Sequence, residues 1–381
     1  MSNWKCGSGI FFYLYILLPE CKNAFVKLSP LNNLQVLRGI SALLVCCYHL
    51  RPSLKGELNG PLLFGYGYIG VSIFFVISGF IISYSTRDVI LNLRAYVLDY
   101  SIKRFIRVIP LYYFYTCMWL LVSHQLLMYF STGSSDLIKV LLFIPLPDKP
   151  PPLYVGWTLN YEIYFYIIFG ISFFFKEKRH FFILIYFLSS LILLPLILHF
   201  MGFEGFRVKD YPGLFYKESP YLSMITNPFL LLFMLGILIS RYYDKIRINK
   251  KMTLLVFFTS LVYFIIVYFS QLNNFILEFS ACGLLVFSTL LLDKVFIDFK
   301  PKRVFTYLGD ISYSLYLVHP IIIIYIPNVF KKLNLDFLNE GSTKFFVLLT
   351  VSVIAGIISF EVLEKRVLFR LKNLFIKKRK S

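Results

Sequence analysis

Six ionisable residues lie inside long apolar stretches of this chain. A charge or a histidine at that depth is costly unless it faces protein or water, so each is a candidate for chemistry. The six are Arg38, His49, Glu162, Glu278, Asp310 and His319. Arg104, Arg107, His124, His199 and Glu361 stand at the ends of such stretches, where long side chains can reach the membrane surface.

Arg38 and His49 are eleven residues apart on one expected helix. At 100° and 1.5 Å per residue they share a face, about 16 Å apart along the axis. Their placement on one face at different depths makes both residues candidates for function. The small residues Ala42, Val45 and Cys46 predict a groove between them for a slender chain. The alternative is a snorkelling arginine and a hydrogen-bonded core histidine.

Arg104 and Arg107 are three residues apart, so one helix face presents both guanidinium groups. Such a pair suits phosphate, because planar bidentate donors match its oxygens. The alternative is ordinary positive charge at the cytoplasmic end of a membrane span.

Two further segments place polar residues within apolar stretches. Glu162 follows Trp157 and could hold a histidine or an acceptor hydroxyl. Ser312 and His319 are seven residues apart and share a helix face, and Pro320 frees a backbone carbonyl nearby. For both segments, the alternative is hydrogen bonding between helices.

The composition identifies the solvent of this chain as a bilayer. Of 381 residues, 58% are hydrophobic, 19% are aromatic and only 15% are charged. These values exclude a soluble globular protein, a disordered chain and a disulfide-rich secreted module. The net charge of +19 comes from cations that separate apolar runs, so we expect no nucleic-acid partner. The six cysteines form no C-x-x-C pair, so no metal site is expected.

The sequence predicts an all-α, polytopic membrane helix bundle with about ten transmembrane helices. Loops that would face the cytoplasm hold 28 Lys and Arg against 10 in the other loops, which predicts that both termini are cytoplasmic. The run 137–146 is half as long and predicts a re-entrant or interfacial piece. The expected spans are 34–50, 67–84, 108–130, 156–175, 181–200, 225–240, 252–270, 274–292, 308–327 and 344–364.

We divide the chain into three parts. Residues 1–30 form an N-terminal extension, whose apolar run is too short to span a bilayer. Residues 31–366 form one transmembrane domain, and residues 367–381 form a basic cytoplasmic tail. The abundance of Ile, Phe, Lys and Asn, with no eukaryotic sorting signal, favours a bacterial inner membrane.

Taken together, these segments resemble the acyltransferase-3 family of integral membrane O-acyltransferases, which modify surface sugars and related exported molecules. The resemblance runs from about residue 31 to residue 366 and rests on five motifs in the family's order. The motifs are LRGISA (37–42) with His49 eleven residues after its arginine, FFVISGF (74–80), RFIRVIP (104–110), WTL (157–159) with Glu162, and SYSLYLVHP (312–320).

The resemblance implies an acyl-CoA donor, usually acetyl-CoA, used from the cytoplasmic side, and a hydroxyl acceptor at the membrane. It makes His49 catalytic and Arg38, Arg104 and Arg107 donor-binding. We therefore expect an O-acetyltransferase that acts on a sugar of a surface polysaccharide, a lipopolysaccharide or a lipid-linked oligosaccharide, with no bound cofactor. The family often ends its last span with Glu-Lys-Pro; Glu364-Lys365-Arg366 lacks the proline, and we assign it no role.

The expected mechanism uses His49 as general base on the sugar hydroxyl. Either Glu162 or His319 would orient the imidazole or the acceptor, and the sequence leaves both open. Two other classes also stay open: a transporter or flippase of a lipid-linked sugar, and a structural membrane protein. The residues expected to line the channel are Phe74, Phe75, Ser78, Gly79, Trp157, Ser312, Tyr313 and Tyr316.

Overall fold

The computed structural model describes residues 31–54, 58–87, 93–123, 134–146, 150–203, 205–207, 214–216 and 219–366. The N-terminal extension and the basic tail lie outside these residues. Within them the predicted all-α class is confirmed, because the strands are limited to the short antiparallel pair β1 (Gly205–Arg207) and β2 (Leu214–Tyr216). Eight helical runs among the described residues are long and apolar enough to cross a membrane, as expected of a helical membrane bundle.

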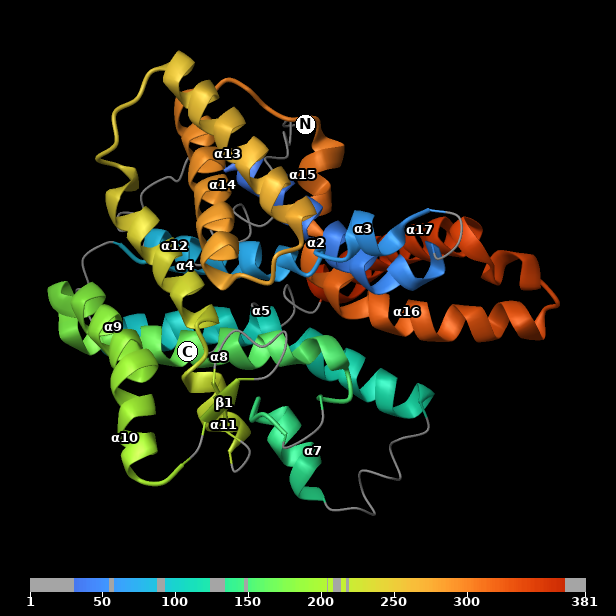
Figure 1. The fold of residues 1–381 in the computed structure, drawn as a ribbon, viewed down its shortest axis with the longest axis horizontal. Coiled ribbons are helices and arrows are strands. Elements are labelled where there is room, and N and C mark those ends of the chain that lie inside the picture. Colours follow the sequence, from blue (N-terminus) through green and yellow to red (C-terminus); the bar gives the residue numbers. More distant parts are fainter. Residues whose placement is uncertain are drawn as a thin grey trace, which may run out of the picture.

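The helices form a bundle in which α2 lies near the middle (Figure 1). The longer ones are α2 (Asn32–Leu50), α4 (Ile69–Ser85), α5 (Leu93–Val122), α8 (Trp157–Ser172), α9 (Arg179–Leu188), α12 (Phe229–Tyr243), α13 (Lys250–Ser270), α14 (Phe275–Val295), α16 (Ser312–Lys332) and α17 (Gly341–Ser359). The shorter ones are α3 (Gly60–Phe64), α7 (Ser134–Leu141), α10 (Leu194–Phe200), α11 (Pro220–Ile225) and α15 (Arg303–Asp310). The 3₁₀ turns are η1 (Arg51–Leu54), η2 (Tyr154–Gly156), η3 (Phe173–Lys178) and η5 (Asp336–Asn339), and the π-helical turns are η4 (Ser189–Leu193) and η6 (Phe360–Glu364).

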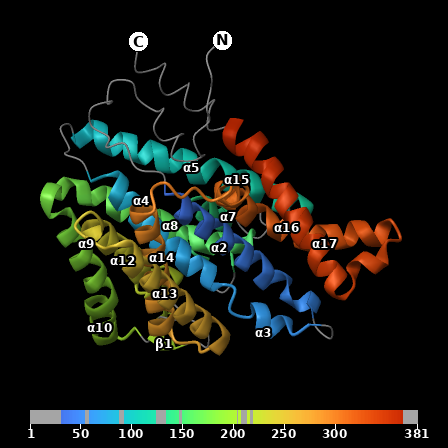
Figure 2. The ribbon, with the colours of Figure 1, turned by 90° about the horizontal axis from the view of Figure 1, so that it is seen from above.

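Eight apolar runs stand where ten spans were predicted. One run, Tyr154–Phe200, holds two predicted spans in 47 residues, and the chain bends inside it at Lys176, whose φ of 47° and ψ of −117° are not helical. The predicted first span, α2, is not among the eight because Asn33, Gln35 and Arg38 make its first half polar. Other helices pack against this helix on two sides: Figure 2 shows α2 between α4 and α14 on one side and α16 and α17 on the other.

The predicted third span began too late. It was placed at 108–130, whereas α5 starts at Leu93 and continues through Pro110. The pair Asp99 and Lys103, 2.6 Å apart one turn along, supports the added helix. Arg104 and Arg107 therefore lie within a helix and not at its first turn. The predicted interfacial piece at 137–146 overlaps the end of α7, and the Tyr113 hydroxyl of α5 donates to the backbone carbonyl of Leu141.

A distant carboxylate caps the first turn of α2. Asp293, near the end of α14, accepts hydrogen bonds from the backbone nitrogens of Asn33 (2.8 Å) and Leu34 (3.0 Å) and from the Asn33 side chain (2.8 Å). The first amides of a helix have no partner within it, so this carboxylate satisfies them and complements the helix dipole. The contact fixes the depth of α2 relative to α14.

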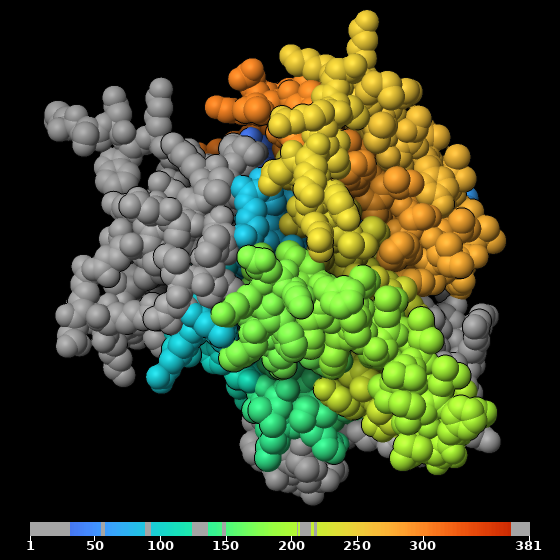
Figure 3. Space-filling view, turned by 90° about the vertical axis from the view of Figure 1, so that its left-hand side faces the viewer, coloured from blue at the N-terminus to red at the C-terminus, as the bar shows by residue number. Residues whose placement is uncertain are grey.

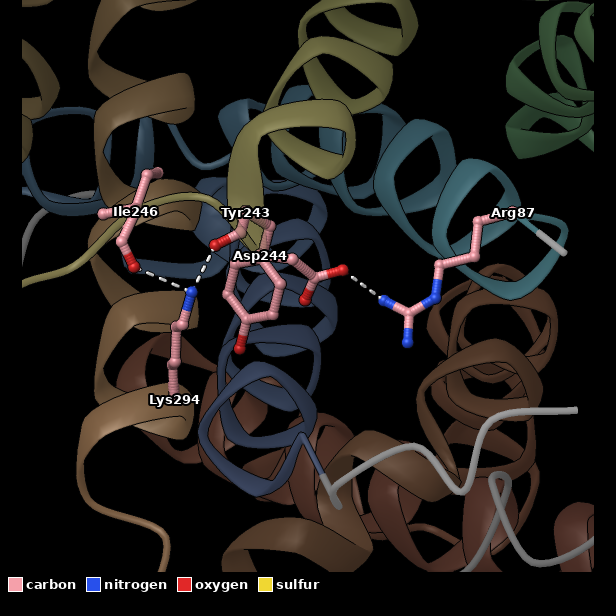
Figure 4. A network of polar contacts seen from close by, with 5 residues as sticks. All are labelled: Arg87, Tyr243, Asp244, Ile246 and Lys294. Atoms are coloured by element: carbon pink, nitrogen blue, oxygen red, sulfur yellow. Dashed lines mark hydrogen bonds and ion pairs between the residues drawn. The ribbon is translucent and has the colours of Figure 1, made fainter. Parts of the chain in front are cut away.

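The ends of α4, α12 and α14 are joined by a second polar network (Figure 4). Lys294 donates to the carbonyl oxygens of Tyr243 (2.5 Å) and Ile246 (2.9 Å), and Arg87 pairs with Asp244 at 2.6 Å. The Asp244 side chain is 60% exposed, so this ion pair contributes little to the stability of the fold.

Large apolar side chains cover the outer surface of α9 and α10, as expected of a face turned toward lipid. Figure 3 looks onto this face and shows α9 (green) side by side with α12 (yellow), which it contacts. Among the exposed side chains are Phe181, Ile185, Ile192, Leu196 and Phe200.

The core centres on α4, which packs backbone to backbone against α12. A Cβ built at Gly79 would lie 2.1 Å from the carbonyl oxygen of Phe233, and one at Gly236 would lie 2.1 Å from that of Val76. Only glycine permits this approach. Gly79 thus faces α12 and lines neither of the cavities described below, contrary to its predicted place in the channel.

We expect Gly79→Ala to destabilise the protein by about 1–3 kcal/mol, because α4 and α12 must separate to admit the methyl group. The measurement is the thermal unfolding midpoint of the detergent-purified chain. Gly170→Ala in α8 is the matched control, since its Cβ would meet the Tyr100 ring at an ordinary 3.4 Å. Equal midpoints for the two variants would contradict the close-packing explanation.

Candidate active site

A narrow cavity, here called the arginine cavity, lies between α2, α4, α5, α8 and α16. Its free volume is about 60 Å³. Three arginines and one carboxylate line it, so its wall carries an excess of positive charge. Ten of the fourteen predicted site residues line this cavity: Arg38, Phe74, Phe75, Ser78, Arg104, Arg107, Glu162, Ser312, Tyr313 and Tyr316.

Arg38 is held rigidly from one side by polar groups of the protein interior. Its Nη1 donates to the Gln35 side-chain oxygen at 2.6 Å and its Nη2 donates to the Ser312 hydroxyl at 3.1 Å. The Gln35 amide in turn donates to Asp310 at 2.9 Å. The arginine is only 4% exposed, so these contacts orient its guanidinium before any ligand arrives.

Arg104 and Arg107 lie on the same face of α5 and both line the arginine cavity. The Arg104 guanidinium lies between the rings of Tyr100 and Tyr166, 5.6 Å from each centroid. Its Nε is buried and has no hydrogen-bond partner within the described chain. A buried donor without a protein partner, beside two further guanidiniums, suits an anionic ligand.

Glu162 belongs to the arginine cavity and not to the surroundings of His49. Its Oε1 accepts hydrogen bonds from the Ser78 hydroxyl at 3.3 Å and from the Tyr166 hydroxyl. It also interacts electrostatically with Arg107. The sequence left Glu162 and His319 open as partners of His49, and Glu162 lines the cavity of the arginines.

A second and much wider cavity, here called the aromatic cavity, contains His49 and Trp157 and has a volume of about 990 Å³. Its wall also carries the amides of Asn160, Gln271 and Asn273. Seven further lining residues are aromatic: Tyr48, Tyr66, Tyr68, Tyr161, Phe215, Phe229 and Tyr316.

His49 and His319 form a close pair of imidazoles. Their ring centroids are 5.4 Å apart, and the Tyr154 ring lies 5.0 Å from His49 on another side. The Nδ1 of His319 donates to the Leu315 carbonyl at 3.1 Å, which leaves its Nε2 as an acceptor. That Nε2 is buried and lacks a hydrogen-bond partner among the residues described. The structure thus places His319, and not Glu162, beside His49.

Tyr316 forms the boundary between the two cavities, since it and Val71 line both. Its hydroxyl lies 2.9 Å from the Thr158 hydroxyl and 3.0 Å from the carbonyl oxygen of Val155, so the ring is held to the start of α8. The His319 ring is 5.9 Å away, which places the boundary next to the imidazole pair.

The small residues of α2 do not form the predicted groove. Ala42 and Cys46 are buried against Leu315 of α16 and neighbouring apolar side chains, whereas Val45 lines the aromatic cavity. Small side chains let the helices approach each other, so these positions serve packing. His319, like Gly79, lines neither cavity directly.

Glu364, a carboxylate close to the site arginines, was not identified from the sequence. Glu364 is only 7% exposed, accepts a hydrogen bond from the Ser314 hydroxyl at 2.7 Å, and interacts electrostatically with Arg38 and Arg107. Its segment departs from the family pattern, and we therefore gave it no role. The signal that could have identified it is an acid at the end of an apolar span.

The comparison with family models places this arrangement in a family. A model described as an acyltransferase domain matches residues 31–362, which is nearly the whole chain. No curated protein and no solved structure matches. Because the match covers the helices that carry both cavities, the chain belongs to the acyltransferase-3 family and is a multi-pass membrane acyltransferase.

Proposed function

We propose that this protein is an O-acetyltransferase that moves an acetyl group from cytoplasmic acetyl-CoA to a sugar hydroxyl. The sugar would belong to a surface polysaccharide or its lipid-linked precursor, and the membrane would be a bacterial inner membrane. The observation that carries the proposal is the meeting of the two cavities at Tyr316, with arginines in one and His49 in the other.

The arginine cavity has the properties of a donor site. Guanidinium groups match phosphate oxygens in pairs, and CoA carries several phosphates next to a slender pantetheine arm. A free volume of about 60 Å³ is too small for a sugar ring, which weighs against a flippase. In this proposal Glu162 and Glu364 position Arg107 by charge, and Arg38 stands further along the arm.

The aromatic cavity has the properties of an acceptor site. Its volume is within the range of pockets that bind small molecules. Aromatic rings such as Trp157 and Tyr161 offer flat apolar surfaces for the CH face of a sugar, and the three amides can bond its hydroxyls.

The proposed reaction needs one base. His49 takes the proton of the sugar hydroxyl while that oxygen attacks the thioester carbonyl, so the new C–O bond forms and the C–S bond breaks. The leaving thiolate takes the proton back from the imidazolium, which gives free CoA and the sugar ester. His319 is a positioning residue in this scheme, because its Nε2 presents a lone pair next to the His49 ring.

We expect His49→Ala to reduce acyl transfer by about 10²–10⁴-fold, the usual contribution of a general base. Mass spectrometry of the surface glycans tests this in a strain that lacks the protein and is complemented with each variant at equal membrane abundance. Release of free CoA by the purified chain gives a second readout, which a transporter would not show. His199→Ala, at an exposed position of α10, is the control and should restore the acyl group. A full acyl level with His49→Ala would refute this mechanism.

We expect the double variant Arg104→Gln, Arg107→Gln to raise the KM for acetyl-CoA by about 10–100-fold, because charge-assisted contacts to phosphate are lost. The KM for acetyl-pantetheine, which has no phosphate, should rise much less. Arg94→Gln, exposed on the same helix, is the control. If the KM values for acetyl-CoA and acetyl-pantetheine rise equally, the arginines stabilise the fold and do not bind phosphate.

We expect Tyr316→Ala to open the boundary between the cavities, so that water competes with the sugar for the thioester. The measurement is the ratio of CoA released to ester formed, which should rise in this variant. Tyr316→Phe keeps the ring but loses the hydroxyl contacts to Thr158 and Val155, so its ratio should lie between those of the native chain and Tyr316→Ala. An unchanged ratio with Tyr316→Ala would show that water is excluded elsewhere.

A further inference from the structure

Arg51 is a cation in the wall of the aromatic cavity that the mechanism does not use. It follows His49 by two residues, at the start of η1. No Asp or Glu stands among the described residues that line this cavity, so its wall holds a positive charge without a matching negative one. Such a wall concentrates anions.

The side chain is held in place before any ligand binds. Its guanidinium carbon lies 3.8 Å from the centre of the Tyr48 ring, and its Nη1 donates to the Tyr48 carbonyl oxygen at 2.5 Å. Among the described residues, that is one hydrogen bond for a group with five N–H donors. The contact with the ring restrains the guanidinium and leaves donors for an oxyanion.

Membrane orientation does not explain this arginine. Cations that orient a membrane protein gather in cytoplasmic loops. With the amino-terminal end of α2 in the cytoplasm, as the charge pattern predicts, Arg51 follows the outer end of that helix. Packing does not explain it either, because the residue is half-buried at a cavity of about 990 Å³.

We propose that Arg51 binds an oxyanion carried by the sugar acceptor, so that the substrates are acidic glycans bearing a carboxylate or a phosphate. This rests on the proposed function only in taking the aromatic cavity as the acceptor site. Arg51 and His49 are close enough to interact electrostatically. The anionic group would therefore be close to the hydroxyl that accepts the acyl group, and a neutral glycan would leave the arginine unpaired.

The test measures binding and needs no acyl transfer. The purified full chain is titrated with methyl glucuronide, glucose 1-phosphate or neutral methyl glucoside, and the rise in its thermal unfolding midpoint gives a half-saturating concentration for each. For the native chain we expect at least one anionic sugar to bind about tenfold or more tightly than methyl glucoside, the effect of one charge-assisted contact. Arg51→Gln should bind all three equally, and its response to methyl glucoside shows that it is folded.

A second variant locates the anion. Arg107→Gln removes a guanidinium from the arginine cavity and should keep the preference for the anionic sugar. The proposal is overturned if Arg51→Gln keeps the preference, if Arg107→Gln loses it, or if the native chain shows none. A preference for the glucuronide alone assigns a uronic acid, and one for the phosphate alone assigns a phosphorylated sugar. If the anion preference stands but no CoA is released, the proposed acyl transfer fails while this inference holds.

Discussion

The burial of the Arg38 guanidinium is the constraint on which the rest of the site depends. A cation that is 4% exposed inside a membrane bundle must be surrounded by protein groups that compensate for its lost hydration. Gln35 supplies a carbonyl and Ser312 a hydroxyl, and Asp310 stands behind Gln35. These contacts can form only if α15 lies directly against α2. Gly309 permits this, since a Cβ there would lie 2.0 Å from the Gln35 carbonyl oxygen.

Once α2, α15 and α16 are locked at this end, helix geometry determines the other end. Both α2 and α16 continue without a break from the contact between Arg38 and Ser312 to His49 and His319. At that end the ring centroids of the two histidines lie 5.4 Å apart. The Asp293 cap fixes the position of α2 along its own axis, because it holds the first amides of α2 to α14. A single buried charge thus positions the pair of imidazoles several turns away.

The sequence predicted what depends on local pattern and failed where tertiary packing decides. The helical periodicity of α2 was enough to place Arg38 and His49 on one face, and the apolar lengths gave the helical bundle. The start of α5 was missed because Asp99 and Lys103 make its first turns look like a loop. The role of Ala42 and the companion of His49 depend on which helix lies opposite, and a single sequence does not contain that information.

Two separate cavities would let an acyl group cross the membrane while the CoA donor stays on the cytoplasmic side and the sugar acceptor on the other side. Under the proposed function, only the thioester and one hydroxyl must meet, so the passage between the cavities has to admit little more than an acetyl group. Tyr316 fits this demand, because its hydroxyl is bonded to the start of α8 and its ring separates the arginines from the histidines. A wider opening would admit water, which attacks the same carbonyl. Under the proposed function, the narrow boundary would therefore protect the thioester from water and also favour short acyl groups.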